Sequence, residues 1–146
     1  MFSQFVKHLD LVREMLKHKK IDYCYLDGSS IDRKEQVERF NKDASVKVFL
    51  ISIKAGGLGL NLTEADYVFI LDPWWNPAVE AQAVDRAHRI GQKQKVFTYK
   101  FITRNTVEEK ILQLQKHKLK LSESLITTEE SIVKTLTRAD IELLLK

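Results

Sequence analysis

A helix expected after Pro77 carries polar residues whose spacing could bind an anion. Gln82, Arg86 and Arg89 stand at positions i, i+4 and i+7, which places them on one helical face. Two guanidinium groups one turn apart can bind a highly charged planar or tetrahedral anion, such as the γ-phosphate of a nucleotide. A solvated basic helix face would show the same spacing, so the pattern alone leaves both interpretations open.

A glycine-rich segment, SIKAGGLGLN at 52–61, follows a run that predicts a buried strand. Glycines let the backbone approach a ligand closely, and bare N–H groups can cradle phosphate oxygens. Ligands of open α/β sheets bind beyond the carboxyl ends of the strands, although a plain tight turn would look the same. Neither the phosphate loop GxxxxGK(S/T) nor an Asp-Glu metal box occurs in the chain. The parts that hold Mg²⁺ and the β- and γ-phosphates are therefore missing.

Adjacent tryptophans stand in the segment DPWWNP at 72–77, between an expected strand and an expected helix. Because exposed tryptophan is costly, Trp74 and Trp75 are expected to pack on the core, pack on a partner domain or touch a nucleic-acid strand. Core or domain packing is the simpler interpretation.

A short polar segment follows the turn at Asp27-Gly28. Ser29, Ser30 and Arg33 could contact a phosphate near a helix start. Ordinary N-capping would explain the same residue types, and on these residues alone it is the preferred interpretation.

Alternating elements must position these residues. Apolar residues at helical spacing and short β-rich runs predict a parallel sheet covered by helices. Only Phe2 remains where a first strand should lie, so we expect that strand to be truncated. The helices are expected at 4–19, 31–42, 76–90 and from 106 onward, and the strands at 22–26, 46–51, 67–71 and 96–102.

Composition narrows the class of protein only moderately. The 146 residues fit one domain, and the net charge of +4 permits nucleic-acid binding without demanding it. Cys24 is the single cysteine, so no intrachain disulfide can form, which suits a reducing compartment. No apolar run approaches 18 residues, and the histidines show no metal-ligand spacing, so neither a membrane span nor a metal site is predicted.

Taken together, the motifs resemble those of one family, the helicase C-terminal (second RecA-like) lobe of Swi/Snf-like superfamily-two ATPases. The spacing between Gly28 and Arg33 resembles that of its compact bacterial members. Residues 1–104 would then form the RecA-like α/β lobe, a parallel sheet with helices on both faces, and 105–146 a helical extension packed on it. The matching segments are FSQF at 2–5, YLDGSS with Arg33 at 25–33, KAGGLGLNL at 54–62, DPWWNP at 72–77, QAVDRAHRIGQ at 82–92 and TVEEKI at 106–111.

The resemblance also implies roles for individual residues. Arg86 and Arg89 would act as arginine fingers across the lobe interface, assisted by Gln82. The residues near the nucleotide would be Gly57, Gly59 and Asp85. The residues expected at the DNA are Gln4, Ser29, Ser30, Arg33, Ser52, Lys54 and Trp75.

The implied function is that of a double-stranded-DNA-dependent ATPase and translocase. ATP and Mg²⁺ would be held mainly by the first lobe, which is not in this chain, so the chain alone is expected to be inactive. Its partners would be duplex DNA and that N-terminal lobe, in the cytoplasm or nucleoid of a bacterium or the nucleus of a eukaryote, with no membrane partner and an unidentified protein or nucleoprotein substrate. The alternatives are a non-catalytic DNA- or protein-binding module and an RNA-directed motor.

Overall fold

The computed structural model describes residues 1–55, 60–85 and 95–124, apart from the side chains of 79, 83 and 117–124. Strands and helices alternate along most of the described chain, as the sequence predicts, and β4 is the next element after β3. The elements are β1 (Phe2–Ser3), α1 (Val6–His18), β2 (Tyr23–Leu26), α2 (Arg33–Lys42), β3 (Val48–Ser52), β4 (Tyr67–Ile70), α3 (Pro77–Asp85), β5 (Phe97–Lys100) and α4 (Val107–Ser124).

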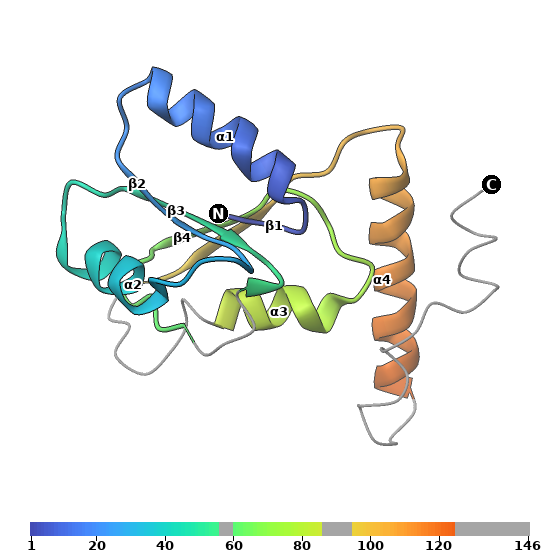
Figure 1. The fold of residues 1–146 in the computed structure, drawn as a ribbon. Coiled ribbons are helices and arrows are strands. Elements are labelled where there is room, and N and C mark those ends of the chain that lie inside the picture. Colours follow the sequence, from blue (N-terminus) through green and yellow to red (C-terminus); the bar gives the residue numbers. More distant parts are fainter. Residues whose placement is uncertain (56–59, 86–94, 125–146) are drawn as a thin grey trace.

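The five strands form one parallel sheet in the order β2-β3-β1-β4-β5. The first strand comprises only Phe2 and Ser3, yet it occupies the centre, where Phe2 is paired with Ile51 of β3 and Ile70 of β4. Helix α1 lies on one side of the sheet and α2 and α3 on the other (Figure 1). The predicted α/β fold with helices on both faces is therefore confirmed.

Strand β3 shows why the apolar runs of this sequence do not alternate with polar residues. Phe49 and Ile51 belong to the core cluster on the side of α2 and α3, whereas Leu50 packs with Leu9 and Leu16 of α1. Because successive side chains of a strand point to opposite faces, a strand covered on both sides needs apolar residues throughout.

Helical spacing also decides which residues of α1 and α2 face the sheet. Leu9 of α1 is fully buried, while Leu11 two positions later is 66% exposed. On α2, Val37 and Phe40 pack against the core as predicted, and the Phe40 ring lies 5.3 Å from that of Phe49. Each helix therefore uses one apolar stripe to cover its side of the sheet.

An exposed aromatic cluster lies on the outer strands. The ring centroids of Tyr67 and Phe97 are 5.6 Å apart, and those of Phe69 and Tyr99 are 5.5 Å apart. Tyr67, Phe97 and Tyr99 are each more than 40% exposed. These residues alternate with the buried Val68 and Ile70, so they lie on the opposite face of β4 and β5 from α3.

Helix α4 stands beside the sheet at the end where the strands finish (Figure 1). It is anchored by Leu114, which is 1% exposed. None of the helices in the described part of the chain is long and apolar enough to cross a membrane. Whether residues 105–146 form a unit separate from 1–104 stays a prediction.

Candidate functional site

The predicted DNA-binding residues all lie at one edge of the sheet. Gln4 follows β1, the segment 27–33 follows β2, Lys54 follows β3, which ends at Ser52, and Trp75 follows β4. Because the strands are parallel and β2, β3, β1 and β4 are neighbours in that order, their carboxyl ends form a continuous row. The fold thus brings together residues that are up to 71 positions apart in the sequence.

The loop after β2 is organised around the carboxylate of Asp27. It accepts hydrogen bonds from the backbone N–H of Ser29 at 2.8 Å, the Ser29 hydroxyl at 2.7 Å and the Tyr25 hydroxyl at 2.9 Å. The Ser29 hydroxyl is the main cause that lowers the pKa of Asp27 to about 2, and burial raises the pKa of Tyr25 to about 12. Ser29 and Ser30 therefore shape this turn, and the N-capping role considered for them is wrong, since the N-cap of α2 is Asp32.

Arg33 closes the same turn from the helix side. Its Nε donates to the carbonyl oxygen of Ser30 at 3.1 Å, and its Nη2 lies 3.4 Å from the carbonyl oxygen of Gly28. Its Nη1 is buried without a hydrogen-bond partner. The guanidinium is therefore largely occupied with the loop, whereas Ser29 is exposed at its tip.

The Asp27 network predicts a pH-dependent contribution to stability. Since the pKa of Asp27 is about 2 in the folded chain and 3.8 without its partners, the contribution is present above pH 4 and is lost as pH falls through 2. We expect Asp27→Asn to lower the free energy of unfolding by about 1 kcal/mol at pH 7, after allowing for solvent screening, and by almost nothing at pH 2. Urea unfolding measures this, and an equal loss at both pH values would contradict it. Asp22→Asn, at the exposed other end of β2, is the control.

Gln4 is held by the buried Asp72, which is 4% exposed. The Gln4 backbone N–H donates to Asp72 Oδ1 at 2.8 Å, and its side-chain Nε2 donates to the carbonyl oxygen of Pro73 at 3.3 Å. Asp72 Oδ2 also accepts the hydroxyl of Ser3 and lies 3.2 Å from Nδ1 of His8. Asp72 therefore joins the ends of β1 and β4, a role that was not predicted from the sequence.

The two candidate DNA-binding residues at the end of β3 differ in solvent exposure. Ser52 is 2% exposed, whereas Lys54 is exposed. The side chain of Lys54 is therefore accessible to a ligand and that of Ser52 is not, and a contact of either residue with DNA stays a prediction. The candidate nucleotide-proximal residues Gly57 and Gly59 lie outside the described residues.

Helix α3 begins as its sequence predicts. The side chain of Asn76 accepts the backbone N–H of Ala78 at 3.0 Å, which caps the helix next to Pro77. The rings of Trp74 and Trp75 lie 6.2 Å apart, and both residues are partly buried. The two tryptophan side chains are therefore packed within the loop and are not fully exposed to solvent.

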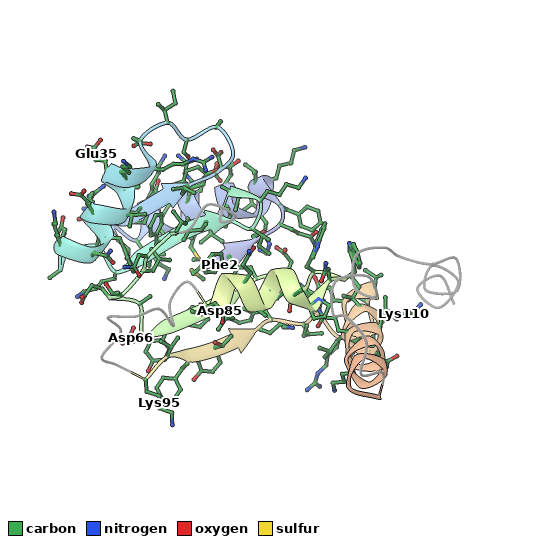
Figure 2. All side chains as sticks on the ribbon, turned by 90° about the horizontal axis from the view of Figure 1, so that it is seen from below. Phe2, Glu35, Asp66, Asp85, Lys95 and Lys110 are labelled. Carbon is green, nitrogen blue, oxygen red and sulfur yellow. The ribbon has the colours of Figure 1, made fainter. Side chains whose placement is uncertain are left out.

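Gln82 and Asp85 lie on α3 itself, away from the row of loops. Both are exposed, while Val84 packs on the core, so the face that carries Gln82 points outward. Figure 2, which views the chain from the α2 and α3 side, shows Asp85 at the end of this helix. Arg86 and Arg89 lie outside the described residues.

A polar cluster at the start of α3 escaped sequence analysis. Glu80, 5% exposed, contacts Lys100 of β5 and Gln115 of α4. The spacing of Glu80 and Val84 at i and i+4 could have indicated that this carboxylate faces inward. Its partners could not be read from local spacing, because they lie 20 and 35 residues further along the chain.

The described residues also differ from the ligand clusters that hold metal ions. Among the described residues, no group of three or more His, Cys, Asp or Glu side chains could hold a metal ion. No Mg²⁺ ligand is therefore assigned among these residues.

The strand order, the parallel pairing and the helices on both faces define the class: this is a RecA-like α/β lobe. A family profile described as "Helicase conserved C-terminal domain" matches residues 1–91. The C-terminal part of the Fun30 ATPase domain, a crystal structure, superimposes with a TM-score of 0.80 and 34% identity, over 98% of this chain and 44% of that one.

Curated relatives agree with this match. The chain is 49% identical to DNA repair protein rad8 of Schizosaccharomyces pombe over 80% of its own length, and 44% identical to ISWI chromatin-remodeling complex ATPase ISW2 of Saccharomyces cerevisiae over 86%. It spans about a tenth of those proteins, 10% and 11% respectively. The chain belongs to the helicase C-terminal family and is a Swi/Snf-like lobe of superfamily two, while the compact bacterial type stays a prediction.

Proposed function

We propose that this chain is the second motor lobe of a double-stranded-DNA-dependent ATPase and translocase of the Swi/Snf type. ATP and Mg²⁺ are held mainly by an N-terminal RecA-like lobe, and this lobe closes on them. Arg86 and Arg89 then act as arginine fingers with the help of Gln82, and the loops at the carboxyl edge of the sheet hold the DNA backbone. The relatives that carry matching sequence are named as a repair protein and as a chromatin-remodelling ATPase, which supports DNA as the partner.

The observation that carries the proposal is the row of candidate DNA-binding residues along neighbouring strand ends. Backbone recognition needs cations, hydroxyls and N–H groups spread over a surface, with no requirement for base-reading geometry. Lys54 offers an exposed ammonium group, and at the neighbouring strand end Ser29 is exposed while its hydroxyl donates to Asp27. Such contacts predict little sequence preference and a steep dependence of affinity on salt.

Translocation along DNA would follow from the closure and separation of the two lobes. When the two lobes close around ATP, the contacts of this lobe with DNA shift relative to those of the first lobe. After hydrolysis the lobes separate and the contacts reset, so repeated cycles carry the motor along one backbone of the duplex. Separation of the strands is not required by this scheme.

The chain alone is expected to bind duplex DNA weakly, with a Kd of about 10⁻⁴ to 10⁻⁶ M at physiological salt, and to hydrolyse no ATP. Half of the clamp and the parts that hold the triphosphate are missing from it. Fluorescence anisotropy with labelled duplex and a phosphate-release assay test both points. Nanomolar binding of duplex DNA at physiological salt, or measurable ATP hydrolysis by the chain alone, would contradict this prediction.

A matched pair of lysines on either side of β3 tests the location of the DNA contacts. Lys54 follows the carboxyl end of the strand and Lys47 precedes its amino end, and both are exposed. In the same binding assay, Lys54→Ala should weaken binding and reduce the salt slope by about 0.9, whereas Lys47→Ala should change neither.

A further inference from the structure

A buried polar cluster joins helix α4 to the double-tryptophan loop. Its members come from separate elements: Glu80 from α3, Lys100 from β5, Gln115 from α4 and the backbone of Trp74 from the loop after β4. Glu80 and Gln115 are 5% and 3% exposed. Buried polar groups of this kind are stable only when their hydrogen bonds are satisfied.

Both backbone groups of Trp74 are bonded to this cluster. Its N–H donates to Glu80 Oε1 at 2.6 Å, and its carbonyl oxygen accepts a hydrogen bond from Gln115 Nε2. The loop is therefore held through its main chain, by one side chain of its own following helix and one side chain of α4.

Gln115 has to donate and accept at the same time. Its Nε2 donates to the Trp74 carbonyl oxygen and to Glu80 Oε1 at 3.0 Å, while its Oε1 accepts from Lys100 Nζ at 3.1 Å. Lys100 also forms an ion pair with Glu80. A carboxylate at position 115 could not donate, and an apolar side chain could do neither, whereas the amide of Gln115 does both.

The loop that this cluster holds leads directly into helix α3. Trp75 follows Trp74, and α3 begins at Pro77 and carries Gln82. Leu114, the residue before Gln115 on α4, is 1% exposed, so this part of α4 is buried. A shift of α4 relative to the sheet would therefore act on the Trp74 peptide and on the first turn of α3.

We propose that Gln115 is a positioning residue, through which α4 sets the conformation of the Trp74–Trp75 loop and the start of α3. This inference deepens the proposed function, because α3 leads to the arginines assigned there as fingers. Gln115 itself contacts neither ATP nor DNA in this scheme.

Tryptophan fluorescence reports on this loop alone, because Trp74 and Trp75 are the chain's two tryptophans. The test variant is Gln115→Met, which keeps the shape of the side chain and removes its hydrogen bonds. Its matched control is Gln113→Met, at an exposed position of the same helix. We expect Gln115→Met to raise the acrylamide quenching constant about twofold while far-UV circular dichroism stays unchanged, and Gln113→Met to match the original chain.

A second variant covers the case in which Gln115→Met fails to fold. Lys100→Met removes the cation from the other side of the amide, at a side chain that is 29% exposed, and should raise quenching in the same direction. If a folded Gln115→Met or Lys100→Met variant quenches like the original chain, the positioning role is wrong.

The same variants in the two-lobe protein separate this inference from the function on which it rests. We expect Gln115→Met to lower the DNA-stimulated kcat about tenfold, equivalent to about 1.4 kcal/mol, with the KM for ATP within about twofold, since ATP is held mainly by the other lobe. Altered fluorescence of the chain by itself, together with a two-lobe protein that shows no DNA-stimulated hydrolysis at all, would support the positioning role and overturn the proposed function. An equal kcat for Gln115→Met and Gln113→Met would overturn the link between α4 and the motor.

Discussion

Replacing Arg89 with alanine in the two-lobe protein is expected to lower DNA-stimulated ATP hydrolysis by about 10³- to 10⁵-fold. An arginine finger stabilises the charge that develops on the transferred phosphoryl group, and its loss corresponds to roughly 4 to 7 kcal/mol of the barrier. Arg89→Lys should restore little, because an ammonium group lacks the planar fork that binds two oxygens at once. Phosphate release at saturating ATP and duplex DNA measures the effect, and Arg86→Ala is expected to behave in the same way.

A matched control is available at the opposite edge of the sheet. Arg39 lies in the last turn of α2, near the amino ends of the strands, and is paired with Asp43 at 4.0 Å. Arg39→Ala removes the same charge from an exposed helix position and should leave turnover within about twofold, since surface ion pairs contribute little. Comparable losses for Arg39→Ala and Arg89→Ala would show that general charge matters and that the finger assignment is wrong.

Asp72→Ala is expected to produce the largest loss of stability, about 2 to 5 kcal/mol in the free energy of unfolding. The carboxylate is buried and accepts hydrogen bonds from the Ser3 hydroxyl and the Gln4 N–H. Its removal leaves these donors at the junction of β1 and β4 without their partner, and burying such groups unsatisfied is costly. Urea or thermal unfolding of the chain measures the change.

The control for Asp72 lies at the other end of the same strand. Asp66 precedes β4 and is exposed, so Asp66→Ala should change the free energy of unfolding by less than about 0.5 kcal/mol. If Asp72→Ala were equally mild, the bonds that join β1 to the DPWWNP loop would contribute nothing to the lobe, and the position of Gln4 would need another explanation.

The elements that sequence patterns predict well are those decided by burial on both faces. VKVFLI at 46–51 and YVFIL at 67–71 predict strands, and β3 and β4 lie within two residues of these bounds. The start of the first helix is also displaced by two residues, from the predicted residue 4 to the observed Val6. The reason is local: the Ser3 hydroxyl accepts the N–H of Phe5 at 3.0 Å, which holds the chain in a turn before the helix begins.

The sequence predicts at which edge of the sheet the candidate site residues lie, but it does not predict which side chains they contact. Parallel pairing explains why the candidate DNA residues share an edge, and that follows from strand and helix alternation alone. Asp72 with Gln4, and Glu80 with Lys100 and Gln115, are long-range pairs whose partners depend on how the elements pack. Side-chain burial is likewise a tertiary property, as the contrast between buried Ser52 and exposed Lys54 shows.

The central claim is that this lobe completes a motor driven by duplex DNA. Its most direct test joins the chain to its N-terminal lobe and measures ATP hydrolysis without nucleic acid, with duplex DNA and with RNA. We predict that duplex DNA stimulates turnover strongly and that RNA does not. Turnover that is absent, indifferent to duplex DNA or stimulated mainly by RNA would contradict the account, and would indicate a binding module in the first two cases or an RNA-directed motor in the third.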